Sequence, residues 1–209
     1  HTRTMTPATL LQTDPSEVAG YKPGLLAADE SAARQPKRMR EALAKSINVA
    51  AVWTINRMGP ANVAKWAGTL GVTSKLGNDL SLALGSYEVE PIELAGVYAT
   101  FAAGGVYDEP RVVTKIVGPD GGEIPLRPQP PARRVLEPDV AYLTTSLMTS
   151  VVDHGTAQRA KVLGRPVAGK TGTSNDSKDT WFAGFSTDIA AVTWVGYDDG
   201  KPLGGAEAG

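Results

Sequence analysis

Apolar residues recur at helical spacing through the middle of the chain. After Pro60, the residues Val63, Trp66, Ala67 and Leu70 fall on one stripe, which is typical of an amphipathic helix with proline in its first turn. The same spacing, read together with its proline starts and glycine stops, predicts helices over residues 37–45, 48–58, 60–70, 91–102 and 140–151.

The last part of the chain carries a different pattern. Residues 167–174, 180–186 and 189–197 are rich in β-branched and aromatic side chains and predict three consecutive strands. The connection between the last two strands is short, which predicts an antiparallel hairpin. Residues 111–117 predict an earlier strand that precedes a Pro-Asp-Gly-Gly turn. Helices in the middle and an antiparallel sheet at the end indicate an α+β fold.

Two segments fit neither pattern. Residues 14–37 are polar and rich in turn formers, so we expect a long irregular loop. Residues 125–131 contain four prolines and predict a short excursion over the surface. The length of 209 residues suits one domain or two small ones.

Composition excludes several classes of function. Lys and Arg number 21 against 22 acidic residues, a net charge of −1, which excludes a strongly basic protein that binds nucleic acid. The absence of cysteine excludes a disulfide scaffold, a thiol nucleophile and a cysteine-ligated zinc. Only His1 and His154 remain as imidazoles. We therefore expect chemistry from hydroxyl, amine, amide and carboxylate groups, with no metal and no cofactor.

The first candidate site is the run Lys170, Thr171, Gly172 and Thr173 on a predicted strand. The ammonium and the two hydroxyl groups together form a receptor for a carboxylate. The glycine allows another backbone to approach closely, and an extended peptide could add to this strand at its edge. The alternative is an ordinary half-buried strand with one exposed lysine.

The second candidate site is Ser46-Ile47-Asn48, between two predicted helices. Ser46 and Asn48 could face one side while Ile47 enters the core, so that a hydroxyl and an amide point into one cleft. Such a pair could relay a proton and hold a peptide carbonyl. The alternative is that Ser46 or Asn48 only caps the second helix.

Other polar and aromatic residues suggest structural roles. His154-Gly155-Thr156 follows a predicted helix and is expected to end it. The sequence shows no Ser or Asp motif that would pair with His154 in a general-base role. Trp181 and Trp194 are expected to pack on the sheet.

Taken together, Ser46-x-Asn48 and the run 170–173 resemble the second and third motifs of penicillin-binding proteins and serine β-lactamases. Three longer segments resemble the transpeptidase domain of class A, bifunctional penicillin-binding proteins: REALAKSINVAAV at 40–52, DLSLALGSYEVEPIELAGVYATFAAGG at 79–105 and VAGKTGTSNDSKDTWFAGFSTDIAAVTWVGYDDG at 167–200. The resemblance covers nearly the whole chain and is weakest at 14–37.

This resemblance implies a penicillin-binding protein or serine β-lactamase-like fold, in which an antiparallel sheet lies beside a helical subdomain. It implies D,D-transpeptidation: a serine attacks the D-Ala–D-Ala bond of a peptidoglycan stem peptide, and an amine of a neighbouring stem resolves the acyl-enzyme. β-Lactam antibiotics would trap the acyl form. The gain is that one difficult amide exchange becomes two acyl transfers.

The resemblance also assigns roles by position. Lys170 would interact with Ser46 and with the substrate carboxylate, which Thr171 and Thr173 would hold. The backbone N–H of Thr173 would supply half of an oxyanion hole. Ser46 would relay a proton to the leaving amine, and Asn48 would hold a substrate amide.

One family motif is missing from the sequence. The family's nucleophile and base lie in Ser-x-x-Lys, yet no lysine here follows a serine by three positions; Lys45 follows Ala42, and Lys170 follows Val167. We expect that motif just upstream of His1 and a final helix after the C-terminus. Residues 1–209 would then be an incomplete transpeptidase domain that does not acylate alone. The complete polypeptide is expected to carry a glycosyltransferase domain and an anchor in the bacterial inner membrane, with this domain in the periplasm or extracytoplasmic space.

Two other functions remain open at this point. A serine β-lactamase or D,D-carboxypeptidase shares the fold and the motifs, although segment 79–105 resembles the bifunctional class. A catalytically inert scaffold or β-lactam sensor is the non-enzymatic alternative. A Ser-x-x-Lys in the gene immediately before His1 would favour the enzyme, and its absence would favour the scaffold or sensor.

Overall fold

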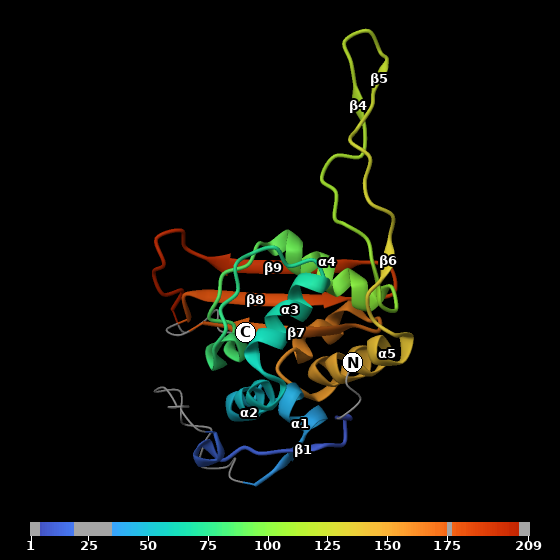
Figure 1. Cartoon of the computed structure of the whole chain (residues 1–209). Coiled ribbons are helices and arrows are strands. Elements are labelled where there is room, and N and C mark those ends of the chain that lie inside the picture. Colours follow the sequence, from blue (N-terminus) through green and yellow to red (C-terminus); the bar gives the residue numbers. More distant parts are fainter. Residues whose placement is uncertain (1–4, 19–34, 175–176, 205–209) are drawn as a thin grey trace.

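The computed structural model describes residues 5–18, 35–174 and 177–204 (Figure 1). Its α-helices are α1 (Met39–Ala44), α2 (Asn48–Met58), α3 (Pro60–Thr69), α4 (Pro91–Ala102) and α5 (Pro138–His154). The described ranges also contain the 3₁₀ helices η1 (Pro15–Glu17), η3 (Leu80–Leu84) and η4 (Gln158–Leu163). Within these ranges, no helix combines the length and the apolar character that a membrane crossing needs.

Among the described residues, the strands form one three-stranded sheet and three two-stranded ribbons. The sheet contains β7 (Ala168–Thr173), β8 (Asp179–Phe185) and β9 (Ala190–Gly196) in that order, and both pairings are antiparallel. The ribbons pair β1 (Leu10–Leu11) with β2 (Lys37–Arg38), β3 (Val106–Tyr107) with β6 (Arg133–Arg134), and β4 (Ile116–Val117) with β5 (Glu123–Ile124). The predicted antiparallel sheet and the hairpin between its last two strands are confirmed.

The predicted helices are confirmed with small changes at their ends. Residues 37 and 38 belong to β2 rather than to a helix, because their backbone pairs with Leu10 and Leu11. Helix α1 therefore begins at Met39. Helix α5 starts at Pro138 and ends at His154, as expected from Gly155. The loop expected over 14–37 contains η1 near its start, and residues 19–34 lie outside the described residues.

Helices α4 and α5 lie against the same three-stranded sheet (Figure 1). Met148 of α5 and Phe101 of α4 contact a cluster that includes Ala168 of β7 and Phe185 of β8. Leu43 of α1 packs in turn against Val151 and Val152 of α5. Helix α5 therefore joins two parts of the chain, because it contacts both β7 and the helix that precedes Ser46.

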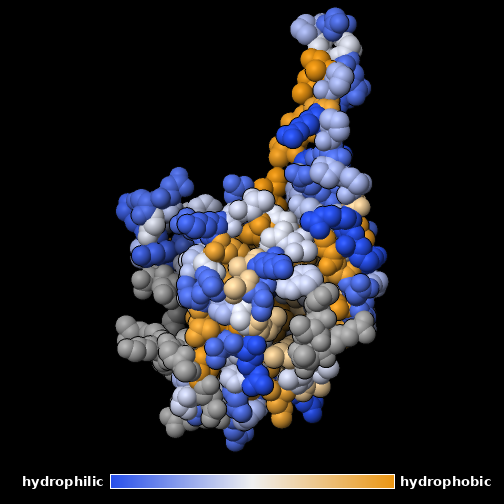
Figure 2. All heavy atoms as spheres, viewed as in Figure 1, coloured by the Kyte–Doolittle hydropathy of each residue, from blue (hydrophilic) through white to orange (hydrophobic). Residues whose placement is uncertain are grey.

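A narrow arm projects from this body (Figure 1). The strand predicted over 111–117 is wrong for its first five residues, since only Ile116 and Val117 pair, with the β5 side of the arm. The β-branched residues that suggested a strand lie in solvent instead: Val112 is 84% exposed and Val113 is 51% exposed. Figure 2 shows apolar side chains along this arm. The proline-rich segment 125–131 is exposed, as predicted.

Candidate active site

Two residues that lie 124 positions apart in sequence meet in the structure. Lys170 Nζ donates a hydrogen bond to Ser46 Oγ at 2.8 Å and another to the backbone oxygen of Thr171 at 2.9 Å. Lys170 projects from β7, and Ser46 stands in the turn between α1 and α2. The structure therefore brings the two sequence motifs together at one place.

The turn that presents Ser46 has a defined hydrogen-bond pattern. Ser46 N–H donates to the oxygen of Leu43 at 3.1 Å, and Ile47 N–H donates to the oxygen of Ala42 at 2.9 Å. These two bonds form a Schellman motif, whose residue after the helix cap takes the left-handed conformation and is usually glycine. Ser46 takes that conformation with φ of 55°. A non-glycine residue there costs about 1 to 2 kcal/mol.

The helix-cap alternative for this motif is wrong. The N-cap of α2 is Ile47, and no side chain makes a capping hydrogen bond there. Ile47 packs instead against Leu11, Ala42 and Ala50, as the sequence predicted. Ser46 and Asn48 on either side are exposed, and the Asn48 side chain has no hydrogen bond within the described ranges. Both side chains are therefore accessible to a ligand.

The amine of Lys170 has an unusual environment for a lysine. Burial lowers its pKa from 10.5 to about 8. In the part of the chain that the structure describes, Lys170 forms no ion pair with a carboxylate. Lys45, next to Ser46 in sequence, points elsewhere and pairs with Glu41 at 3.1 Å. Lys170 thus supplies a cation that an anionic ligand can pair with.

Strand β7 is an edge strand of the described sheet, with β8 on one side. Ser174 N–H donates to the oxygen of Asp179 at the β8 end of this pairing, at 3.0 Å. Because the direction of N–H groups alternates along an antiparallel strand, the N–H groups of Thr171 and Thr173 point away from β8. Gly172 between them is exposed and adds no side chain. This edge can accept an extended peptide.

The end of β7 is held by Asp179 and its neighbours. Asp179 accepts a hydrogen bond from Ser174 Oγ at 3.0 Å and one from the indole of Trp194 at 2.9 Å. Trp181 and Trp194 also pack with ring centroids 6.4 Å apart, in agreement with the predicted packing role. These contacts fix the strand immediately after Thr173.

Arg40 joins the Ser46 side of the site to α5. Its guanidinium donates to the oxygen of Ser146 at 2.6 Å, to Ser150 Oγ at 2.7 Å and to Ser146 Oγ at 3.0 Å. Sequence reasoning missed Arg40 because its partners lie 106 and 110 positions away and no local pattern signals them. It also missed the contacts of Thr156 and Asp179, because their partners, 5 to 15 positions away, are set by how the helix and the strands pack.

The comparison that decides the family is with a family model. The model described as "Penicillin binding protein transpeptidase domain" matches residues 3–206. The chain belongs to the penicillin-binding protein transpeptidase family. The resemblance inferred from the motifs is thereby confirmed.

Relatives agree with this assignment of the transpeptidase domain. Penicillin-binding protein 1A of Aquifex aeolicus is 42% identical over 171 residues, which cover 79% of this chain and 23% of the relative. Penicillin-binding protein 1A of Pseudomonas aeruginosa is 31% identical over 225 residues, with 83% of this chain and 27% of the relative covered. The chain spans about a quarter of the length of these curated relatives.

Solved structures give the same fold. Penicillin-binding protein 1A from Haemophilus influenzae has a TM-score of 0.81 and 28% identity, over 98% of this chain and 37% of that one. The penicillin-binding protein PonA1 from Mycobacterium tuberculosis has a TM-score of 0.82 and 24% identity, over 98% of this chain and 59% of that one. The predicted α+β fold of this family is confirmed.

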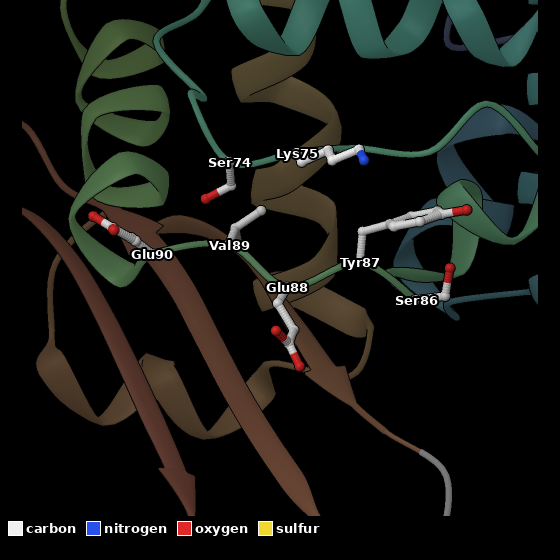
Figure 3. Close-up of a pocket in the computed structure, with 7 residues that line it drawn as sticks. All are labelled: Ser74, Lys75, Ser86, Tyr87, Glu88, Val89 and Glu90. Atoms are coloured by element: carbon white, nitrogen blue, oxygen red, sulfur yellow. The ribbon is translucent and has the colours of Figure 1, made fainter.

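The transpeptidase domain also contains a cavity of about 530 Å³. Figure 3 shows Ser74 and Lys75 on one segment and residues 86–90 on another, with Tyr87 and Glu88 among the side chains that line it. None of the site residues predicted from sequence lines this cavity. In the described ranges, no group of three or more His, Asp or Glu side chains could hold a metal ion.

Proposed function

We propose that this chain is the D,D-transpeptidase part of a peptidoglycan synthase, which cross-links stem peptides through a serine acyl-enzyme and binds β-lactams. The observation that carries the proposal is the 2.8 Å hydrogen bond from Lys170 to Ser46 beside the open edge of β7. The names of the relatives, penicillin-binding proteins 1A, support the same class.

In this proposal the donor stem peptide lies along the edge of β7. Its terminal carboxylate pairs with the Lys170 ammonium and accepts hydrogen bonds from Thr171 and Thr173. Gly172 leaves room for the peptide backbone, and the Asn48 amide holds a peptide group of the donor. The N–H of Thr173 points to the open edge and stabilises the oxyanion of the tetrahedral intermediate.

In each acyl transfer one bond to the carbonyl carbon forms and one breaks. The nucleophilic serine forms a C–O bond to the penultimate D-Ala carbonyl, the C–N bond breaks, and D-Ala leaves as an amine. The proton that the nucleophilic serine gives to its base passes through Ser46 to that amine, and Lys170 orients the Ser46 hydroxyl. The amine of a neighbouring stem then forms a C–N bond to the ester carbonyl and gives up a proton. The C–O bond breaks, and the serine leaves with that proton. Because the 209 residues contain no Ser-x-x-Lys, we propose that the nucleophile and its base lie outside them.

The proposed function places the protein at the bacterial inner membrane, with this domain facing the periplasm or extracytoplasmic space. Its partners there would be peptidoglycan stem peptides that end in D-Ala–D-Ala. The rest of the same polypeptide would supply a glycosyltransferase domain and a membrane anchor. This location is inferred from the family, because its substrate, peptidoglycan, lies outside the inner membrane.

Labelling with a fluorescent penicillin tests the proposal. We expect the natural polypeptide that carries these residues to be labelled covalently, and the 209 residues alone to stay unlabelled. Lys170→Ala should lower the second-order labelling rate constant by about 10² to 10³, because the carboxylate loses its cation. Lys115→Ala is the matched control: Lys115 lies on the arm, where it pairs with Glu123 at 3.2 Å, and its loss should leave the rate constant unchanged.

Three outcomes would contradict the proposal. No labelling of the natural polypeptide would favour an inert scaffold. Rapid release of hydrolysed penicillin would favour a β-lactamase. Hydrolysis of D-Ala–D-Ala peptides with no cross-linked product when acceptor amine is present would favour a carboxypeptidase.

A further inference from the structure

Thr156 follows the end of α5 and contacts the predicted substrate-binding strand directly. Its Oγ1 lies 2.5 Å from Oγ1 of Thr171, and either hydroxyl can be the donor in this hydrogen bond. Among the described residues, neither hydroxyl forms another side-chain hydrogen bond. The sequence suggested only that this segment ends a helix, so the contact assigns it to a second task.

The backbone around Thr156 is fixed against the helix that leads to Ser46. Thr156 N–H donates to the oxygen of Ala44 at 3.1 Å. A Cβ on Gly155 would lie 2.2 Å from that same oxygen, so the close approach requires glycine. Thr156 therefore contacts α1 through its backbone and β7 through its side chain. Together with the Lys170–Ser46 bond, it spans the gap between the two motifs.

The direction of the hydroxyl bond decides what Thr171 can offer a ligand. Each hydroxyl has one proton. If Thr171 donates to Thr156, the Thr171 proton is already used. Thr171 then presents only oxygen lone pairs to a carboxylate, and these lone pairs repel it. If Thr156 donates to Thr171, the Thr171 proton is free to point outward. A hydroxyl that accepts one hydrogen bond is also a stronger donor in the next.

We propose that Thr156 is a positioning residue for carboxylate binding, which donates its proton to Thr171 and so keeps the Thr171 hydroxyl as a donor to the ligand. This rests on the proposed function, because the carboxylate is that of the donor stem peptide or of a β-lactam. An approaching anion selects this direction of the bond, since the reverse direction faces it with oxygen lone pairs. Thr156 itself does not touch the substrate.

The test compares Thr156→Val and Thr156→Ser in the natural polypeptide that carries this chain. We expect Thr156→Val to raise the benzylpenicillin concentration that gives half the limiting acylation rate by about fivefold to tenfold, the effect of one lost hydrogen bond. The limiting acylation rate itself should change little. Thr156→Ser keeps the hydroxyl and should restore binding. Thr144→Val is the matched control, because it also removes one threonine hydrogen bond, the one that Thr144 on α5 donates to the oxygen of Val140 at 2.8 Å.

Two further measurements separate positioning from a general structural effect. In a double-mutant cycle, Thr156→Val should add nothing to Thr171→Val, because the first residue acts through the second. With the methyl ester of benzylpenicillin, which has no carboxylate, Thr156→Val should react as fast as the wild type. Melting temperatures of the variants identify any that fail to fold, and Thr156→Ala, which also lacks the hydroxyl, replaces Thr156→Val in that case.

The outcomes distinguish this inference from the proposed function. If the wild type is not acylated at all, the proposed function is wrong. If the wild type is acylated and Thr156→Val reacts with the same concentration dependence, the positioning role is wrong. The same holds if the two threonine variants have additive effects, or if the ester shows the same loss as the acid.

Discussion

Two of the turns that adopt the left-handed backbone conformation do so with opposite choices of residue. In the arm, the turn between β4 and β5 places Gly121 at φ of 79°, and Gly118 N–H donates to the oxygen of Gly122 at 2.8 Å. In the body, the turn between α1 and α2 places Ser46 at φ of 55°. Glycine adopts this conformation without strain, whereas serine does not.

The difference indicates where the chain retains a residue that its local structure does not favour. The arm turn can follow local preferences, because its side-chain hydrogen bond, from Gly122 N–H to Asp120 at 3.1 Å, stays within the turn. The Ser46 turn retains a hydroxyl that accepts from Lys170, although glycine would relieve the backbone. A strained residue at the meeting point of two motifs is the pattern expected of a functional site. Substitutions in the body and in the arm test this contrast.

The largest effect is expected from replacing Ser46 itself. Ser46→Ala and Ser46→Gly should each lower penicillin acylation of the natural polypeptide by about 10² to 10³, because both remove the proposed proton relay. Only Ser46→Gly should also relieve the backbone, and it should raise the free energy of unfolding by about 0.5 to 1 kcal/mol over Ser46→Ala. Labelling kinetics and urea denaturation measure the two effects. Equal stability of the two variants would contradict the strain argument.

The next effect concerns the arginine that holds α1 against α5. Arg40→Ala should lower the free energy of unfolding by about 2 to 3 kcal/mol, since it leaves three hydrogen bonds unmade. Arg40→Lys should restore little, because an ammonium cannot reproduce the fork of the guanidinium. The matched control is Arg111→Ala at the base of the arm, where an exposed pair with Asp108 at 3.6 Å should contribute less than about 0.5 kcal/mol. Comparable losses at both positions would end the contrast.

The sequence predicted those parts of the fold in which local pattern and final environment agree. The apolar stripes after Pro60 and Pro91 gave α3 and α4, and the residues of β8 and β9 gave the hairpin. It failed at 111–115, because β-branched residues are common both in buried strands and in this exposed arm. The local pattern at 111–115 is the same as that of a buried strand. The two differ in whether a neighbouring strand is present to pair with them.

For the candidate site, the motifs identified Lys170 and Ser46, and the structure supplied their contact. The left-handed conformation of Ser46 could not be predicted, since a serine there disagrees with the usual glycine. Thr156 and Arg40 could not be predicted either, because their contacts depend on how α1, α5 and β7 pack. Tertiary packing thus determines the residues that position the motifs.

Burial lowers the pKa of Lys170 to about 8. Because the folded pKa lies below the unfolded one, the unfolded chain binds more protons between these values, and stability should rise with pH from about 8 toward 10.5. This contribution, on the order of 1 kcal/mol after solvent screening, should be absent in Lys170→Met.

The same titration should appear in acylation. The second-order rate constant should fall above about pH 8, as the ammonium that pairs with the carboxylate loses its proton. Lys170→Arg should move that fall to higher pH, because a guanidinium stays charged. A fall that remains near pH 8 in Lys170→Arg would assign it to another group.

The smallest effect is expected in the arm. Gly121→Ala introduces there the strain that Ser46 carries in the body, with no steric contact, since a Cβ on Gly121 meets nothing within 4 Å. The hairpin should lose about 1 kcal/mol of local stability, seen as faster hydrogen exchange of the Gly118 N–H, which donates to Gly122 across the turn. Acylation and the melting temperature should stay at their wild-type values, because the arm makes no contact with Ser46 or Lys170 among the hydrogen bonds of the described residues. A loss of acylation would mean that the arm affects the site. The contrast between the Ser46 turn and the arm turn would then not separate a functional position from a structural one.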